Sequence, residues 1–207
     1  MGGHRSGSVR ENLWRTRQNH EFTDFTFICK AARFPVHKVI VYSQSNVFHM
    51  ACTRPFKESS TNEYDLSDCS VDNVQWLIDF LYMGTYQTEY SKNPTLTDHI
   101  AMFALGDMYD IEPLALYAAE QFRIVIAAID TFEEILPLIP QVYGSTPEHR
   151  KELREQIVKF TRCPIRGEKG AMESREWYDD VAQQCPDFIK DLVFSYFDWP
   201  DPQEVEW

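Results

Sequence analysis

The chain has 207 residues, a length that suits one large domain or a domain of about 120 residues with a helical extension. Hydrophobic residues make up 43% of the chain and aromatic residues 14%, which is enough apolar side chain to fill a core and excludes wholesale disorder. The 20 basic and 32 acidic residues give a net charge of −12, which repels a phosphate backbone and argues against DNA or RNA binding.

The five cysteines indicate a reducing compartment, because their number is odd and they include no C-x-x-C pair. No uncharged apolar run approaches the roughly 20 residues that a membrane-spanning helix needs. We therefore expect an intracellular protein, in the cytoplasm, the nucleus or both, with no membrane partner. Residues 1–8 are rich in glycine and lack the apolar core of a signal peptide, so we interpret them as a vector-derived leader.

The pattern of residues 9–19 predicts a short helix. Leu13 and Trp14 form an apolar patch among charged residues, and nothing within the segment covers this patch, so the helix needs a surface to lie against. Two runs rich in β-branched and aromatic residues follow, at Phe25–Cys29 and Phe34–Val36, and predict a β-hairpin.

Two short helices are predicted over residues 38–53, with Ser43 or Ser45 as the cap of the second. Residues 53–62 are polar and contain a proline, which predicts a loop, and residues 63–66 are typical of a short strand.

A stripe of apolar residues at spacings of three and four predicts a helix from Val71 to Tyr82 that ends at Gly84. Thr95 and Asp98 have the spacing of a capping box at the start of another helix. Further helices are predicted over 111–128, from Asp130 to about Tyr143, from Thr146 through Thr161, over 177–181 and over 188–197, with a linker at 167–170.

No catalytic motif is found: the sequence has no nucleophile elbow, no Walker A loop and no dinucleotide-binding glycine motif. His49 and Cys52 have helical i, i+3 spacing, but no second pair follows to complete a metal site, so we interpret Cys52 as a small apolar residue. His37 has no nucleophile beside it and is interpreted as a structural hydrogen-bonding residue. We therefore expect no enzymatic activity, no cofactor and no bound metal.

Six short motifs follow one another in the first half of the chain: Asp24-Phe-Thr-Phe, Pro35-Val-His37-Lys38, Ser45-x-x-Phe48, Phe56-Lys-Glu58, Tyr64-Asp-Leu66 and Phe80-Leu-Tyr82-x-Gly84-x-Tyr86. Together they resemble the BTB/POZ domain over residues 9–127, and the residues within the motifs are most similar to those of BTB proteins of filamentous fungi. The resemblance implies an α+β fold, with a small mixed sheet flanked by α-helices. It also implies a C-terminal helical extension over 128–197, followed by an acidic tail over 198–207.

The resemblance further implies a homodimer. In the family the N-terminal helix, which here carries Leu13 and Trp14, crosses the dimer axis, and residues equivalent to Asp24 and Lys38 lie near the interface. Other matched positions maintain the fold in the family: His37, Ser45, Phe48, Tyr82 and Gly84.

Phe56, Lys57 and Glu58 match the hydrophobic-x-Glu motif through which BTB adaptors bind the N-terminal domain of cullin-3. An exposed aromatic ring can anchor in a partner's groove while a glutamate fixes the register. Two functions stay open: an adaptor that bridges cullin-3 to an unknown substrate protein for ubiquitination, and a dimerisation or scaffold module, for instance in a transcriptional assembly, that binds no cullin. The chain has no Kelch, MATH or zinc-finger pattern that would identify the substrate.

Overall fold

The computed structural model describes residues 7–55, 57–87, 93–129, 131, 134–162 and 175–198. The chain divides into two compact units. Unit 1 comprises residues 1–94 and 105–117, and unit 2 comprises residues 95–104 and 118–207. The predicted linker at 167–170 and residues 199–207 of the predicted tail lie outside the described residues.

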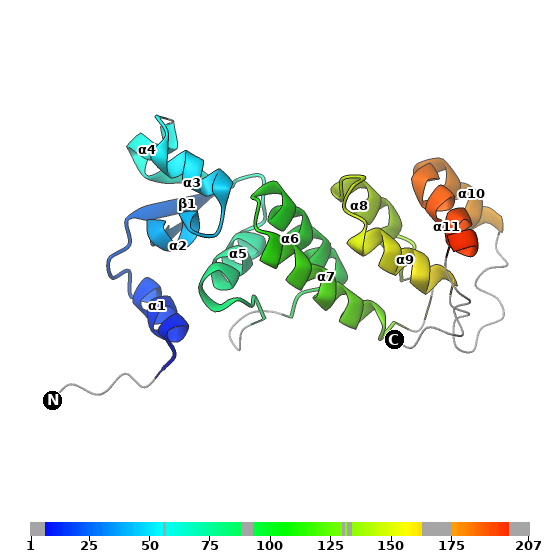
Figure 1. The fold of residues 1–207 in the computed structure, drawn as a ribbon, viewed down its shortest axis with the longest axis horizontal. Coiled ribbons are helices and arrows are strands. Elements are labelled where there is room, and N and C mark those ends of the chain that lie inside the picture. The colour runs from blue at the N-terminus through cyan, green and yellow to red at the C-terminus, as the bar shows by residue number, and fades with distance from the viewer. Residues whose placement is uncertain are drawn as a thin grey trace. The chain divides into compact units, whose positions relative to one another are not determined.

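Unit 1 contains a small mixed sheet with helices around it, as the resemblance implied (Figure 1). Among the described residues the sheet has three strands in the order β2-β1-β3; β1 pairs antiparallel with β2 and parallel with β3. The elements in chain order are α1 (Val9–Gln18), β1 (Phe25–Cys29), β2 (Ala32–Val36), α2 (Lys38–Tyr42), α3 (Asn46–Thr53), α4 (Lys57–Thr61), β3 (Glu63–Asp65) and α5 (Val71–Met83).

The core of unit 1 is built on the alternating side chains of β1. Phe25, Phe27 and Cys29 are buried because every second side chain of a strand points to the same face. Phe48 from α3 packs against Phe27, with ring centroids 5.0 Å apart, and stacks on Tyr109 at 4.7 Å. Aromatic rings from the sheet, from α3 and from residue 109 therefore form one cluster.

The start of α3 shows which of the two candidate serines caps it. Ser45 has an extended backbone, and its Oγ accepts a hydrogen bond from the Phe48 N–H at 3.1 Å. The same hydroxyl donates to the Tyr109 carbonyl at 2.5 Å, so the cap also fixes α3 to the turn after α6.

The prediction of a loop over residues 53–62 is wrong in part, because α4 forms one short helix at 57–61. Residues 57–61 contain neither proline nor glycine, so nothing in them prevents a single helical turn. The turn ends at Asn62, whose φ of 56° is left-handed, a conformation that asparagine adopts more readily than most residues. The chain then enters β3 beside β1.

Helix α5 has the predicted ends. The Ser70 hydroxyl accepts the Asn73 N–H at 3.0 Å, and the helix stops at Gly84 with a φ of 76°. The φ of Gly84 favours glycine there, because residues with a Cβ are strained in this conformation; the nearest atom to an added Cβ would be a guanidinium nitrogen of Arg10 at 2.6 Å, the end of a long side chain that can shift.

Two long helices, α6 (Leu96–Met108) and α7 (Glu112–Ile126), each have residues in both units. Thr95 and Asp98 form the predicted reciprocal cap of α6, because the Thr95 N–H donates to the Asp98 carboxylate at 2.8 Å and the Asp98 N–H donates to the Thr95 hydroxyl at 3.3 Å.

Unit 2 continues with four more described helices: α8 (Leu138–Ser145), α9 (Glu152–Arg162), α10 (Arg175–Gln184) and α11 (Pro186–Asp198). Two of them begin later than predicted. A helix from Asp130 would need backbone N–H groups at Pro137 and Pro140, which have none, so α8 begins at 138, where Pro140 falls in the first turn. The chain after Thr146 first makes a tight turn, closed by the Arg150 N–H donating to the Pro147 carbonyl.

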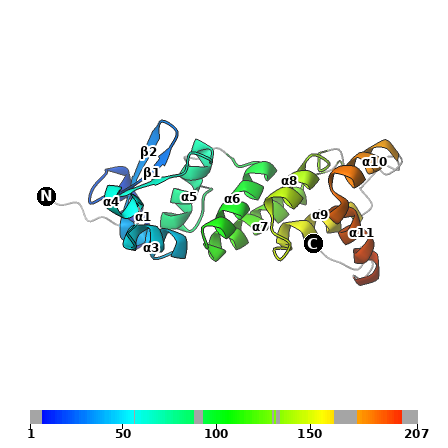
Figure 2. The same ribbon diagram turned by 90° about the horizontal axis from the view of Figure 1, so that it is seen from above.

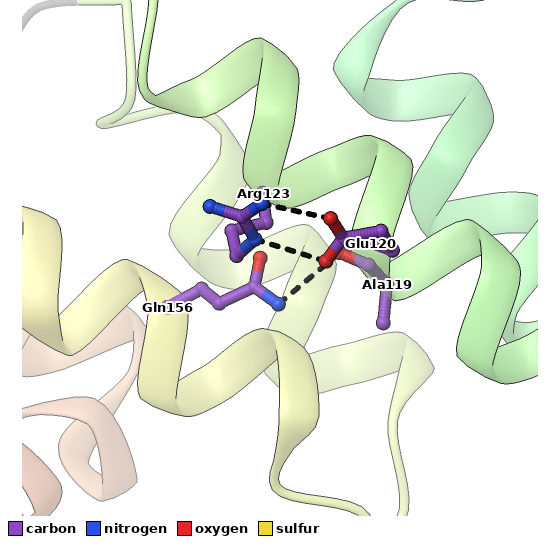
Figure 3. A network of polar contacts seen from close by, with 4 residues as sticks. All are labelled: Ala119, Glu120, Arg123 and Gln156. Atoms are coloured by element: carbon purple, nitrogen blue, oxygen red, sulfur yellow. Dashed lines mark hydrogen bonds and ion pairs between the residues drawn. The ribbon is translucent and has the colours of Figure 1, made fainter. Parts of the chain in front are cut away.

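The helices of unit 2 are joined by polar contacts as well as by apolar packing. Figure 2 shows α8, α9 and α11 as neighbours, and α9 packs against both of the others. Gln156 of α9 donates to the Ala119 carbonyl of α7 at 3.1 Å, beside the ion pair of Arg123 and Glu120 (Figure 3). None of the described helices is long and apolar enough to cross a membrane.

Candidate functional site

Helix α1, on which the predicted dimer depends, is fastened to its own unit by three side chains on one face. Trp14 Nε1 donates to Asp79 Oδ1 of α5 at 3.2 Å, Arg10 donates to the Met83 carbonyl at 3.2 Å, and Arg17 Nε donates to the Pro35 carbonyl at 3.1 Å. The three lie at i, i+4 and i+7, which places them on the same side of the helix. Part of the predicted apolar patch is thus covered within the chain.

Asp79 is the buried charge of this contact, with 3% of its surface exposed. Burial raises the pKa of Asp79 above its ordinary value, and the hydrogen bonds from Trp14 and Gln75 and the charge of Arg17 offset the rise only in part. Burial likewise lowers the pKa of Arg17, against the pull of Asp79. The charge of each residue therefore offsets part of the free-energy cost of burying the charge of the other.

His37 is held on both ring nitrogens and has a structural role, as predicted. Its Nε2 lies 2.9 Å from the Glu21 carbonyl, which can only accept, so Nε2 carries the proton. The Tyr82 hydroxyl therefore donates to Nδ1 at 2.7 Å while accepting the His37 backbone N–H at 2.9 Å. Burial raises the pKa of Tyr82 to about 12.

Asp24 and Lys38 meet, but not as a pair of charged side chains. The Asp24 carboxylate accepts the backbone N–H of Lys38, the first residue of α2, at 2.7 Å. It takes the place of a cap from His37, whose side chain is engaged with Tyr82. The Lys38 ammonium donates instead to Asn62 at 2.6 Å and lies 5.6 Å from the centre of the Phe25 ring.

Exposed apolar side chains remain around these contacts. Val9 of α1 is 75% exposed, Phe22 in the segment between α1 and β1 is 87% exposed, and Leu13 is half-buried. Isolated exposed apolar residues are ordinary, but a phenyl ring exposed to this extent in a left-handed backbone conformation is not. The segment that enters the sheet thus presents apolar surface to the solvent.

Glu58 is the residue of the predicted cullin-3 motif whose side chain the structure describes. Phe56 and the side chain of Lys57 lie outside the described residues. Glu58 is half-buried in the first turn of α4, and its charge contributes, after burial, to the raised pKa of Tyr64. Helix α3 precedes the motif and contacts α4. The exposed side of α3 is lined by residues spaced three or four apart: Asn46, His49, Met50 and Thr53.

The sequence model of the BTB/POZ domain matches residues 13–123, more than half of the chain. The chain belongs to the BTB/POZ family. Kelch-like protein 7 of Gallus gallus is 26% identical over 98 residues, which are 47% of this chain and 16% of the relative. Kelch repeat and BTB domain-containing protein 4 of Homo sapiens is 24% identical over 106 residues, 51% of this chain and 20% of the relative. The matches thus span a fifth or less of these relatives.

The BTB domain accounts for the fold-maintaining residues that the motifs suggested. Phe48, Ser45 and Tyr82 are buried, and Gly84 ends α5 in the left-handed conformation.

The N-cap of α1 is Ser8, the last residue of the predicted leader. The Glu11 N–H donates to the Ser8 hydroxyl at 3.2 Å.

Asp79 and Arg17 of the BTB domain were not predicted as site residues. A signal for Asp79 was present, because a lone carboxylate interrupts a run of large apolar residues in the predicted helix. His49 and Cys52 are not brought into a metal site: in the part of the chain that the structure describes, no three His, Cys, Asp or Glu side chains are placed to hold an ion. The His49 ring packs on Tyr42 instead, at 5.4 Å.

Proposed function

We propose that this BTB protein is a homodimeric adaptor that binds the N-terminal domain of cullin-3 and brings it a substrate protein for ubiquitination. The function is protein association and not catalysis. The observation that carries the proposal is the position of Glu58. It lies in the first turn of α4, the short helix that comes after α3 in the chain and contacts it.

The contact with cullin-3 is proposed to extend from the motif onto α3. Met50 lies on the exposed side of α3 with 38% of its surface accessible, and methionine adapts its shape to a partner more easily than branched residues do. Phe56 supplies the aromatic anchor in this proposal, and Glu58 the charge that fixes its register. The polar residues of α3 then form a rim around an apolar centre.

A separate surface, formed by α1 and the segment that follows it, is proposed to pair two copies of the chain. Val9 and Leu13 are one helical turn apart on α1, and Phe22 adds a large exposed ring. Asp24 and Lys38, with Trp14, are proposed to lie near this interface, as the family resemblance implies. A stable pairing buries roughly 1,600 Å² or more, so these residues would form only its centre.

An alternative is a BTB dimerisation or scaffold module that binds no cullin. It is favoured by the exposed apolar residues of α1 and of the segment after it, which need only a second copy of the chain. The substrate protein and the cytoplasmic or nuclear location are proposed from the sequence alone, as is the fungal affinity, since Kelch-like protein 7 and Kelch repeat and BTB domain-containing protein 4 are animal proteins.

Titration calorimetry against the cullin-3 N-terminal domain separates the two functions. Phe56→Ala should weaken binding about thirty- to a hundredfold, the equivalent of roughly 2 to 3 kcal/mol of lost apolar burial. Glu58→Lys should also weaken binding, whereas Lys57→Ala, at the variable middle position, should change affinity less than about threefold. No binding by the wild-type protein at about 10 μM, or equal binding by all three variants, would contradict the adaptor and favour the scaffold.

A further inference from the structure

Two cysteines of unit 1 meet where β1 ends. Cys29 is the last residue of β1, and Cys69 lies in the loop between β3 and α5, 40 positions further along the chain. The Cys29 S–H donates to the Cys69 carbonyl oxygen at 3.4 Å. Cys29 is fully buried, while Cys69 is half-buried and so reachable from solvent. Both are free thiols.

The loop that carries Cys69 is held against β1 by the backbone. The Leu66 N–H donates to the Ile28 carbonyl at 2.7 Å, the Lys30 N–H donates to the Ser67 hydroxyl at 3.0 Å, and the Cys69 N–H donates to Leu66 at 2.9 Å. These bonds lie on both sides of Cys29 along the chain. The two cysteines are therefore neighbours by construction of the fold, and their proximity does not depend on a flexible side chain alone.

The contact brings the Cys29 sulfur to the backbone of Cys69. A carbonyl oxygen lies about 2.4 Å from its own Cα, so the sulfur of Cys29 lies within about 6 Å of the Cα of Cys69. This contact is compatible with the roughly 4.4 to 6.8 Å that separates the two Cα atoms of a disulfide. Burial, and after it the neighbouring Cys29, raises the pKa of the Cys69 thiol, so the reactive thiolate of Cys69 becomes more abundant as the pH rises.

We propose that Cys29 and Cys69 are a reversible redox pair that closes into a disulfide when a hydroperoxide is present. The Cys69 thiolate attacks the peroxide O–O bond, which leaves a sulfenic acid on Cys69 and releases water or an alcohol. Cys29 then attacks this sulfur, the S–S bond forms, and the hydroxyl leaves as water with the Cys29 proton. Two electrons from the two thiols reduce the one O–O bond.

The disulfide would join the end of β1 to the residue just before Ser70, the cap of α5. Helix α5 carries Asp79, which holds Trp14 of α1. Oxidation would therefore tie the start of α5 to the sheet and stabilise the surface on which α1 lies. A bridge that closes a loop of about 40 residues should raise the melting temperature by about 5 to 15 °C if the native geometry accepts it without strain.

The test uses the full chain treated with hydrogen peroxide, alkylation of the remaining thiols and peptide mapping without reductant. We expect a peptide pair linked through Cys29 and Cys69, absent after dithiothreitol, and a higher melting temperature that the reductant reverses. Cys69→Ser should abolish the link. Cys52→Ser is the matched control, because Cys52 is also half-buried and also has a pKa raised by burial, and it should leave the link intact.

Three results would overturn the redox pair. One is a Cys69 that ends as sulfinic acid while Cys29 stays alkylated as a free thiol. Another is a link from Cys69 to a different cysteine. The last is a Cys29–Cys69 product that melts no higher than the reduced protein, since this would show that the bridge forms only in a distorted chain.

Discussion

The hydrogen bond between Trp14 and Asp79 makes the docking of α1 on α5 open to measurement. Asp79→Ala removes a carboxylate that accepts Trp14 Nε1 at 3.2 Å and Gln75 Nε2 at 2.8 Å. Both donors would lose their acceptor in a largely buried position, and Arg17 would lose the charge that offsets its own burial. Hydrogen bonds to charged groups contribute about 1.5 to 3 kcal/mol each, and here one oxygen serves both, so we expect a loss of about 2 to 4 kcal/mol.

Thermal unfolding followed by circular dichroism measures this loss. At about 2 to 4 °C per kcal/mol for a chain of this size, the melting temperature of Asp79→Ala should fall by about 5 to 15 °C. Asp79→Asn is the control: the raised pKa of Asp79 means that its surroundings favour a neutral group, and asparagine keeps an acceptor, so this variant should stay within about 1 kcal/mol of the wild type.

The contribution of Asp79 to the stability of the fold changes with pH in a defined direction. Because the folded-state pKa of Asp79 lies above its ordinary value of 3.8, the folded protein takes up this proton more readily than the unfolded chain. Ionisation of Asp79 therefore costs stability as the pH rises through the raised pKa, and the cost is relieved as the pH falls towards 3.8. The wild type should gain stability relative to Asp79→Asn as the pH falls through the raised pKa of Asp79 towards 3.8. An Asp79→Ala variant that melts within about 1 °C of the wild type would refute the docking of Trp14 on a buried carboxylate.

Substitutions at three further positions are tested by urea unfolding. Asp24→Ala should cost about 0.5 to 2 kcal/mol, the effect of a lost helix cap, and Asp24→Asn less; a loss above about 3 kcal/mol would point to a buried ion pair with Lys38 instead. Tyr82→Phe should cost about 1 to 3 kcal/mol because it removes both bonds to His37, and no change in midpoint would exclude those bonds. Gly84→Ala should cost more than about 1 kcal/mol, because the φ of 76° strains any residue that has a Cβ; a neutral effect would contradict the left-handed conformation of this residue.

Local signals in the sequence predicted most of the elements of unit 1. The apolar stripe of α5 and its glycine stop define a helix by themselves, and the alternation in Phe25–Cys29 defines a half-buried strand. The short helix α4 was missed because one turn of polar residues carries no periodicity to detect. The late starts of α8 and α9 depend on proline positions and a tight turn, which shift boundaries without changing the apolar pattern.

The contacts between distant segments could not be read from the sequence. The resemblance implied that Asp24 and Lys38 lie near a dimer interface; within the chain, the Asp24 carboxylate accepts the backbone N–H of Lys38, a contact that no side-chain pattern reveals. In the same way Trp14 was expected to need a cover, and the acid that binds it lies 65 positions away. The pair of Trp14 and Asp79 follows from the packing of α1 on α5, and not from the residues near either one in the sequence.

The central claim, a dimeric adaptor for cullin-3, is tested most directly by the mass of the protein in solution, alone and with the cullin-3 N-terminal domain. Light scattering after size exclusion should give about twice 24.3 kDa for the protein alone, and a larger complex with one cullin domain for each BTB chain. Leu13→Asp should lower the first mass to that of a monomer, and Glu58→Lys should weaken only the complex with the cullin domain. A monomeric wild type at micromolar concentration, or a dimer whose mass is unchanged by the cullin domain, would contradict the account.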